Sequence, residues 1–395
     1  MSHSTGWAGP SHVPSTDGAA RAARVPAAER TVRGLLESVD VGVDGGRPWD
    51  LRVHDPRLFE RLLAGGSLAL GESYMDGWWD CERLDELIER LLGGGIEERV
   101  RASARALWVA LRSRLVNVQR GQRAFTVARR HYDLGNDFFR RMLDRRLTYS
   151  CGYWRQAGDL DAAQEAKLDL ICRKIGLEPG QTVLDIGCGW GSFAGFAAER
   201  YGACVVGVTV SREQARYAQA RYGGLPVEVR VQDYRDVEGT FDHIVSVGMF
   251  EHVGHRNYRT YMETAERCLR PDGRFLLHTI GRNRTGADID TWIEKYIFPN
   301  SMLPSARQIT DAAEGLFVLR DWHTFGADYV PTLMAWLGNC ERLWDAGGGP
   351  REERFRRMWR YYLLASAGGF RADHCQLWQV LFSKRGCPGM PAAVR

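Results

Sequence analysis

Length, composition and charge set the first limits on this chain. Its 395 residues suit two domains, and 44% hydrophobic with 26% charged residues is an ordinary globular composition. No apolar run approaches the roughly 18 residues that span a bilayer. Nine scattered cysteines without a Cys-x-x-Cys pair argue against a disulfide framework and a zinc site, so we expect a reducing cytosol and no bound metal.

The first 120 residues predict a lead and a small helical domain. Residues 1–28 are rich in Ser, Gly, Pro and Ala and lack the basic-then-apolar order of a signal peptide, so we expect a disordered lead. Residues 30–120 are interpreted as helical. The pair Asp55-Pro56 predicts a helix start, Gly65-Gly66 would end that helix, and a second helix over 84–92 is closed by three glycines.

Residues 99–131 form a basic segment that contains nine arginines and no Asp or Glu. Its apolar residues recur at steps of three or four, the period of an amphipathic helix. One interpretation is a helix with a solvated basic face. The other is a surface that meets the phosphate groups of lipid or nucleic acid. The sequence shows no base-reading motif, so lipid is favoured and we expect no nucleic-acid partner.

From about residue 160 onward, strand and helix patterns alternate. Near-continuous apolar strands between helices predict a parallel sheet covered on both faces, with a ligand at the carboxyl edge of its strands. The expected strands are 182–186, 204–209, 227–231, 243–247 and 274–279. The expected helices are one capped by Asp161 and stopped by Gly176, then 192–201, 213–222 and 258–269, with a turn at 270–273.

The catalytic part is predicted to span residues 121–390. Within it, residues 281–349 depart from the alternating rhythm and are aromatic and apolar. We interpret this stretch as an insertion that covers the substrate. Residues 377–384 are expected to return as a late strand.

The run Val-Leu-Asp-Ile-Gly-Cys-Gly-Trp-Gly at 183–191 is the most informative motif. A strand that ends in glycines lets the backbone press against a nucleoside-type ligand. The alternative is a plain strand-to-helix turn. The spacing Asp-x-Gly-x-Gly-x-Gly resembles the first motif of the Rossmann-like, class I methyltransferases that use S-adenosylmethionine. That resemblance implies an α/β fold, here with the small helical N-terminal domain in front.

Further segments carry a narrower resemblance. They are Gly-Glu-Ser-Tyr-Met-Asp-Gly-Trp-Trp (71–79), His-Tyr-Asp-Leu-Gly-Asn-Asp-Phe-Phe (131–139), Tyr-Ser-Cys (149–151), Val-Gly-Met-Phe-Glu-His-Val-Gly (247–254), Phe-Leu-Leu-His-Thr-Ile-Gly (275–281), Lys-Tyr-Ile-Phe-Pro-Asn (295–300) and Phe-Gly-Ala-Asp-Tyr (325–329). In this order, over about residues 30–385, they resemble the cyclopropane fatty acid synthase family. The resemblance implies transfer of a methylene group from S-adenosylmethionine to a cis double bond of an unsaturated phospholipid acyl chain, through a carbocation that bound bicarbonate deprotonates.

The resemblance also implies the catalytic residues. The bicarbonate site would be Cys151, Glu251, His278, Ile280 and Tyr329. Cys151 and Ile280 would act through backbone N–H groups, His278 and Tyr329 as donors, and Glu251 by orienting the set or accepting its proton. Taken alone, Cys151 could be a small buried residue, His278 a core histidine and Tyr329 a cap on the insertion. Independently of the resemblance, Glu251 and His278 lie at the ends of expected strands, at the ligand edge.

The cofactor residues follow from the same motifs. Gly187, Gly189 and Gly191 would surround the methionine part, with Asp185 ordering the loop, while Tyr149 and Ser150 close over the cofactor. Asp233, after Gln232, is expected at the adenine amino group. The second expected strand ends without the acidic residue that usually binds the ribose, and Thr209 and Gln214 are the expected substitutes.

Other functions stay open at this point. Related enzymes leave a methyl or methylene branch instead of a ring. A methyltransferase for a small polar acceptor predicts an open, polar pocket, and a non-catalytic lipid-binding protein predicts loss of the glycine turn or of Glu251. From the resemblance we expect a homodimer, and a cytoplasmic protein peripherally associated with the inner face of the membrane.

Overall fold

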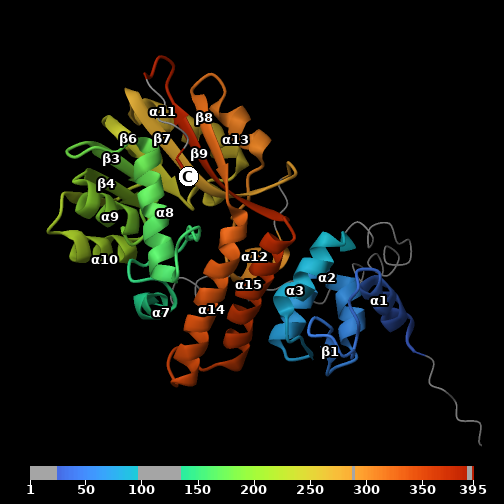
Figure 1. Cartoon of the computed structure of the whole chain (residues 1–395). Coiled ribbons are helices and arrows are strands. Elements are labelled where there is room, and N and C mark those ends of the chain that lie inside the picture. Colours follow the sequence, from blue (N-terminus) through green and yellow to red (C-terminus); the bar gives the residue numbers. More distant parts are fainter. Residues whose placement is uncertain (1–24, 97–134, 287–289, 389–393) are drawn as a thin grey trace, which may run out of the picture.

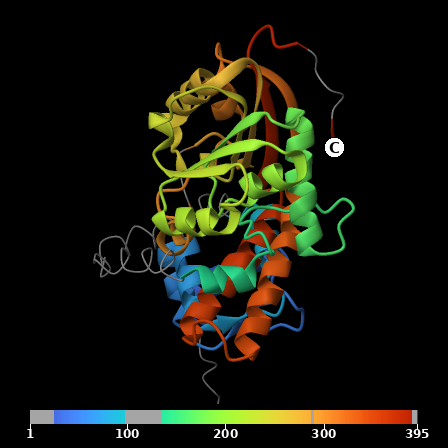
Figure 2. The ribbon, with the colours of Figure 1, turned by 90° about the vertical axis from the view of Figure 1, so that its left-hand side faces the viewer.

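The computed structural model describes residues 25–96, 135–286, 290–388 and 394–395. The predictions for residues 1–24 and for the basic segment 99–131 lie outside the described residues. Figure 1 shows a sheet flanked by helices, joined through two long helices, α14 (Tyr329–Asp345) and α15 (Glu353–Arg371), to the N-terminal helices. Seen from the side in Figure 2, the helical part lies beneath the sheet.

The N-terminal part contains α1 (Ala27–Glu37), α2 (Leu58–Met75) and α3 (Leu84–Gly93), with a short antiparallel pair of β1 (Arg52–Val53) and β2 (Trp79–Asp80). The predicted helix over 84–92 is confirmed. The predicted end of a helical segment at Gly65-Gly66 is confirmed.

Gly66 has a non-helical backbone, with φ 52° and ψ −131°, so α2 consists of two helical segments that meet there, and the second segment buries more of its residues. The predicted start at Asp55-Pro56 is wrong. The carboxylate of Asp55 accepts from the backbone and guanidinium of Arg57, so the helix begins only at Leu58.

Seven strands form the main sheet in the order β5-β4-β3-β6-β7-β9-β8. The first five strands in this order, from β5 through β7, run parallel to one another. β9 is antiparallel to both of its neighbours, β7 and β8. Their bounds are β3 (Thr182–Ile186), β4 (Cys204–Thr209), β5 (Val227–Val231), β6 (Phe241–Val247), β7 (Leu269–Arg282), β8 (Val318–Thr324) and β9 (Cys375–Ser383). The predicted parallel core and the late return strand are confirmed.

Three sequence expectations need correction here. The predicted turn at 270–273 is a bulge inside β7, between the pairs Phe241–Leu269 and His243–Arg274. The stretch expected only to cover the substrate contains β8, because its residues complete the sheet edge beside β9.

The predicted cap Asp161 is also wrong. Asp159 caps α8 (Leu160–Ile175) by accepting from the Ala162 N–H, whereas Asp161 accepts from the Arg145 N–H at 2.8 Å.

Alternating strand side chains bury both faces of the sheet. Val183, Val205 and Val245 pack under α8 and α9 (Ser192–Tyr201). Leu184 and Ile244 pack under α11 (Tyr258–Cys268) and α13 (Ala306–Ala313) on the other face. The helix α10 (Arg212–Tyr222) packs against the outer strands β4 and β5. Successive side chains of a strand point to opposite faces of the sheet, and both faces are covered here, so these strands are apolar along most of their length.

The helical layer joins the two predicted domains in one apolar core. The helices α7 (Gly135–Met142), α12 (Thr291–Tyr296), α14 and α15 share it with α1 to α3. A Cβ on Gly368 of α15 would lie 2.5 Å from the Asp85 carbonyl oxygen of α3, so these helices touch through backbone. The buried Glu72 of α2 accepts from the Tyr296 hydroxyl at 2.8 Å and from Lys295 of α12.

Candidate active site

The glycine turn follows β3 as predicted. Gly187 (φ 84°), Gly189 (φ 55°) and Gly191 (φ 80°) all lie in the left-handed region, where other residues are strained. A Cβ on Gly187 would come within 2.8 Å of the Met249 Cβ, whereas nothing lies within 4 Å of one on Gly189. The turn therefore packs on one side and opens into free space on the other.

That space is a cavity of about 2080 Å³ at the carboxyl edge of the parallel strands. It runs from the glycine turn past Glu251 and His278 to the apolar residues of α1, α2 and α3. One cavity is thus lined by elements that are far apart in the sequence. The expected cofactor residues that line it are Tyr149, Ser150, Asp185, Gly187, Gly189, Thr209, Gln214 and Gln232.

Two expected cofactor residues do not line the cavity. Gly191 is the N-cap of α9 and forms the packed side of the turn, against Ala218 and Tyr222. Asp233 caps the short helix that follows β5, and Arg235 donates to its carboxylate at 2.7 Å and 2.9 Å. That guanidinium holds the pKa of the Asp233 carboxyl below its usual range. An adenine amino group would therefore compete with Arg235 for this carboxylate.

Asp185 is buried at the base of the turn, and its Oδ2 has no hydrogen-bond partner among the described residues. Burial raises its pKa to about 7, and the nearby Lys167 opposes that rise. Lys167 is fully buried on α8 and donates to the Ser150 hydroxyl at 2.9 Å. Sequence reasoning missed Lys167. The available signal was a lysine on the helix face that also carries the apolar Leu168 and Ile171.

Glu251 lies in the turn after β6 and is buried. Its Oε1 accepts from the Ile280 N–H at 2.7 Å, while its Oε2 has no partner among the described residues. Burial raises the Glu251 pKa to about 7, although the Ile280 hydrogen bond lowers it. The Ile280 N–H, which is expected to bind an anion, thus donates to Glu251 in this structure.

His278 lies on β7 and is 1% exposed. Burial lowers its pKa well below the usual value, helped by the positive charges of Lys167 and Lys174 on α8. Its Nδ1 lies 3.3 Å from the amide nitrogen of Gln379, and its Nε2 has no partner in the described part of the chain. His278 is therefore a neutral imidazole with one nitrogen left over for a ligand.

Of the remaining two expected catalytic residues, Tyr329 lines the cavity and Cys151 does not. Tyr329 begins α14, lines the cavity and stacks on Phe370 with ring centroids 4.5 Å apart. Cys151 is fully buried and does not line the cavity. Its thiol donates to the Gly152 carbonyl at 3.1 Å and lies 3.8 Å from the Thr332 hydroxyl, and burial raises its pKa well above the usual value. Such a thiol is a poor nucleophile.

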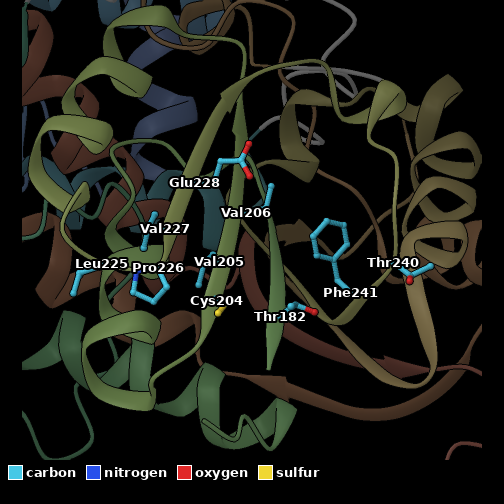
Figure 3. Close-up of a pocket in the computed structure, with 10 residues that line it drawn as sticks. All are labelled: Thr182, Cys204, Val205, Val206, Leu225, Pro226, Val227, Glu228, Thr240 and Phe241. Atoms are coloured by element: carbon cyan, nitrogen blue, oxygen red, sulfur yellow. The ribbon is translucent and has the colours of Figure 1, made fainter. Parts of the chain in front are cut away.

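A second hollow, of about 430 Å³, lies at the opposite edge of the sheet (Figure 3). Its lining includes Thr182, Cys204, Val227 and Phe241, the first residues of β3 to β6. Since ligands of such sheets bind at the carboxyl edge, the larger cavity is the functional site.

Across the described ranges, no helix is both long enough and apolar enough to cross a bilayer. The same residues hold no group of three or more His, Cys, Asp or Glu side chains with the geometry of a metal site.

The fold and the glycine turn at the carboxyl edge define an S-adenosylmethionine-dependent methyltransferase of the Rossmann-like class. A solved coclaurine N-methyltransferase shares the fold, with a TM-score of 0.62 over 80% of this chain, at 23% identity. The model of the family described as mycolic acid cyclopropane synthetase matches residues 119–380. The chain belongs to this family and is an enzyme of the methyltransferase class.

Relatives support the assignment over nearly the whole chain. The cyclopropane-fatty-acyl-phospholipid synthase of Escherichia coli K12 is 51% identical over 355 residues, which are 90% of this chain and 93% of the relative. The tuberculostearic acid methyltransferase UfaA1 of Mycobacterium tuberculosis is 34% identical, over 88% of this chain and 86% of the relative. The solved cyclopropane synthase MmaA2 of the same organism is 32% identical, with a TM-score of 0.60 over 67% of this chain and 99% of that one.

Proposed function

We propose that this enzyme transfers a methylene group from S-adenosylmethionine to a cis double bond of a phospholipid acyl chain and closes a cyclopropane ring. The name of the 51% identical relative, which spans 90% of this chain, supports the reaction. The observation that carries it is that Glu251 and His278 line one cavity and that each has a buried polar atom, Oε2 and Nε2, without a partner among the described residues.

A small anion with both donor and acceptor oxygens would satisfy these two atoms if it bound beside Glu251 and His278. Bicarbonate is such an anion, and when bound it supplies the base for the last proton. Buried polar atoms without partners are costly, so a ligand that satisfies them gains affinity. His278 and Tyr329 would donate to it, and Glu251 would accept from it or orient it. The Ile280 N–H, which Glu251 now holds, would be shared with the anion.

The cofactor fits the glycine turn, whose open side faces the cavity at Gly189. S-adenosylmethionine supplies the electrophilic methyl group. The turn holds the methionine part, and the Tyr149–Ser150 segment lies across the same cavity. An alkene is a weak nucleophile, so this chain must hold the two reactants in line and close together.

Aromatic side chains wall the place where positive charge develops on the acyl chain. Tyr149, Phe298 and Tyr362 line the cavity, and the ring centroids of Phe298 and Tyr362 are 5.9 Å apart. The Tyr149 hydroxyl donates to the Tyr362 hydroxyl at 3.2 Å. Ring faces attract a cation and exclude water that would quench it.

The apolar end of the cavity suits the acyl chain. Leu36, Leu63 and Leu91 of the N-terminal helices line it together with α15. We extend the proposal to a phospholipid presented at the inner face of the membrane, with the basic segment 99–131 meeting its anionic surface. From the family resemblance we also propose a homodimer, which light scattering after gel filtration tests directly.

The test is incubation of the purified protein with methyl-labelled S-adenosylmethionine, bicarbonate and vesicles of cis-unsaturated phospholipid. Proton NMR of the acyl products should show upfield cyclopropane signals. Vinyl methylene or branched-methyl signals would assign the enzyme to the methyl- or methylene-branching lipid methyltransferases of the same family. Absence of label in lipid, despite cofactor binding, would overturn a lipid acceptor altogether.

A further inference from the structure

We propose that Gln379 is a positioning residue that keeps the His278 proton on Nε2, so that this imidazole is a hydrogen-bond donor toward the anion. This inference rests on the proposed function, because it assigns the direction of one hydrogen bond in the bicarbonate site. Nothing in the sequence motifs pointed to Gln379, which lies in β9 (Cys375–Ser383).

The sheet register places Gln379 where it can act on His278. Gln379 of β9 pairs directly with His278 of β7 on one side and with His323 of β8 on the other. It is fully buried. A buried amide without hydrogen bonds is destabilising, and the partner of this amide among the described residues is the His278 imidazole.

Its nitrogen faces the imidazole. Gln379 Nε2 lies 3.3 Å from His278 Nδ1, whereas Gln379 Oε1 has no partner among the described residues. An amide nitrogen can only donate, so Nδ1 accepts and carries the lone pair. In a neutral imidazole the proton must then lie on Nε2.

Burial keeps His278 neutral, and the charges around it act in the same direction. The groups that face it from the packed elements are Lys167 and Lys174 of α8, whose positive charges disfavour a second proton, and His323 of β8, whose own pKa is lowered to about 4 by burial. The Lys174 ammonium lies 3.0 Å from His323 Nδ1 and 3.5 Å from the Asp321 carboxylate. A doubly protonated His278 would therefore add a cation to a buried, already positive region.

The consequence concerns the ligand. An Nε2–H in the buried cavity wall donates to an anion oxygen, and it does so without a net charge that must be desolvated. The other tautomer would turn a lone pair toward that oxygen and repel it. Gln379 thus sets the polarity of His278 without touching the ligand.

The test compares Q379M with a matched control, Q376M, in the full-length enzyme. Methionine keeps the length of the side chain and removes the donor. Gln376 lies on the same strand, is not part of the cavity lining, and bonds only toward Asp373 in the described structure. Protonated and bare imidazole nitrogens have well-separated ¹⁵N shifts, and the His278 signals are assigned from their loss in H278N.

In the wild type and Q376M, His278 should show a protonated Nε2 and a bare Nδ1. In Q379M the proton should spread over both nitrogens, and in Q379E, whose carboxylate accepts from Nδ1–H, a proton should appear on Nδ1. If Q379M does not fold, Q379E is compared with the wild type and Q376M in its place. A bare Nε2 in the wild type, or an unchanged tautomer in both Gln379 variants, would overturn the proposal.

Binding provides the second readout. The affinity for ¹³C-labelled bicarbonate, followed by NMR line broadening with S-adenosylhomocysteine present, should weaken about tenfold in Q379M, the size expected for one hydrogen bond to an ion. The bicarbonate concentration for half-maximal turnover should rise in parallel, with kcat at saturation little changed. A wild-type enzyme indifferent to bicarbonate would overturn the proposed base, and the ¹⁵N spectra would then decide the tautomer by themselves.

Discussion

At the scale of single residues, burial sets the chemistry of this site. Glu251 and Asp185 are carboxyls whose pKa values are raised to about 7 by desolvation, and His278 is kept neutral by the same cause. Each of the three has a side-chain atom without a partner in the described residues. A ligand that completes such a set gains affinity from it, and perturbed pKa values of this kind cluster at active sites.

We expect Glu251→Gln to lower kcat by about 100-fold or more, since it removes a group that orients or accepts the last proton. The affinity for S-adenosylmethionine, measured by calorimetry, should stay within a few-fold because Glu251 is placed at the anion. The exposed Glu263→Gln serves as the control. Equal activity of the two variants would remove Glu251 from the mechanism.

The raised pKa of Glu251 also predicts how stability depends on pH. Between pH 4.5 and about 7 the unfolded chain ionises at this residue while the folded enzyme stays protonated, so the wild type loses stability as pH rises. Glu251→Gln cannot ionise. Relative to the wild type, its free energy of unfolding should therefore rise by about 1–3 kcal/mol across this window. Above the window the difference between the two proteins should stay constant. Urea titrations at several pH values measure this, and parallel curves throughout would contradict the assigned shift.

At the scale of elements, close backbone contacts decide which helices can meet. The helix α15 passes α3 at Gly368, where a Cβ would lie 2.5 Å from the Asp85 carbonyl and 2.8 Å from the Ile88 Cβ. This contact joins the N-terminal helices to the helix that walls the cavity. A change far from the chemistry can therefore reach the acyl end of the site.

We expect Gly368→Ala to lower the free energy of unfolding by about 1–3 kcal/mol through overpacking. Gly338→Ala in α14 is the matched control, because its Cβ would meet only the far end of Arg342, at 3.5 Å. That variant should be neutral or gain up to about 1 kcal/mol from helix propensity. Denaturant unfolding of both variants gives the comparison, and equal stabilities would show that α15 and α3 can separate at little cost.

At the scale of the whole molecule, one cavity connects the sheet to the N-terminal helices, and the apolar core of those helices extends to α7, α12, α14 and α15. A long acyl chain needs such length, whereas a small polar acceptor does not. In the sequence, the basic segment 99–131 stands between these parts, and its nine arginines would suit the anionic surface that the proposed function requires. The proposed reaction therefore uses the chain as a unit, from the N-terminal helices to the late strand.

Charge reversal in the basic segment tests this use. Replacing Arg101, Arg105 and Arg112 with glutamate should weaken binding to anionic vesicles, by about 1 kcal/mol or more for each charge near the surface. The loss should be largest at low salt, because screening removes the attraction. Cosedimentation with anionic and zwitterionic vesicles measures it. Unchanged binding to anionic vesicles would show that these arginines have a structural role only.

The sequence by itself determined the parallel sheet, the glycine turn and the family, because these depend on local patterns: apolar runs, glycines with a required conformation, and long motifs in order. It also placed Glu251 and His278 at the ligand edge, since strand ends of one sheet edge meet. Only the tertiary structure decided the partners. Asp233 is held by Arg235, the Ile280 N–H by Glu251, and Lys167 and Gln379 approach the site from α8 and β9. Apart from Asp233 and Arg235, which are only two residues apart, these contacts join residues of different elements through packing, and no local pattern encodes them.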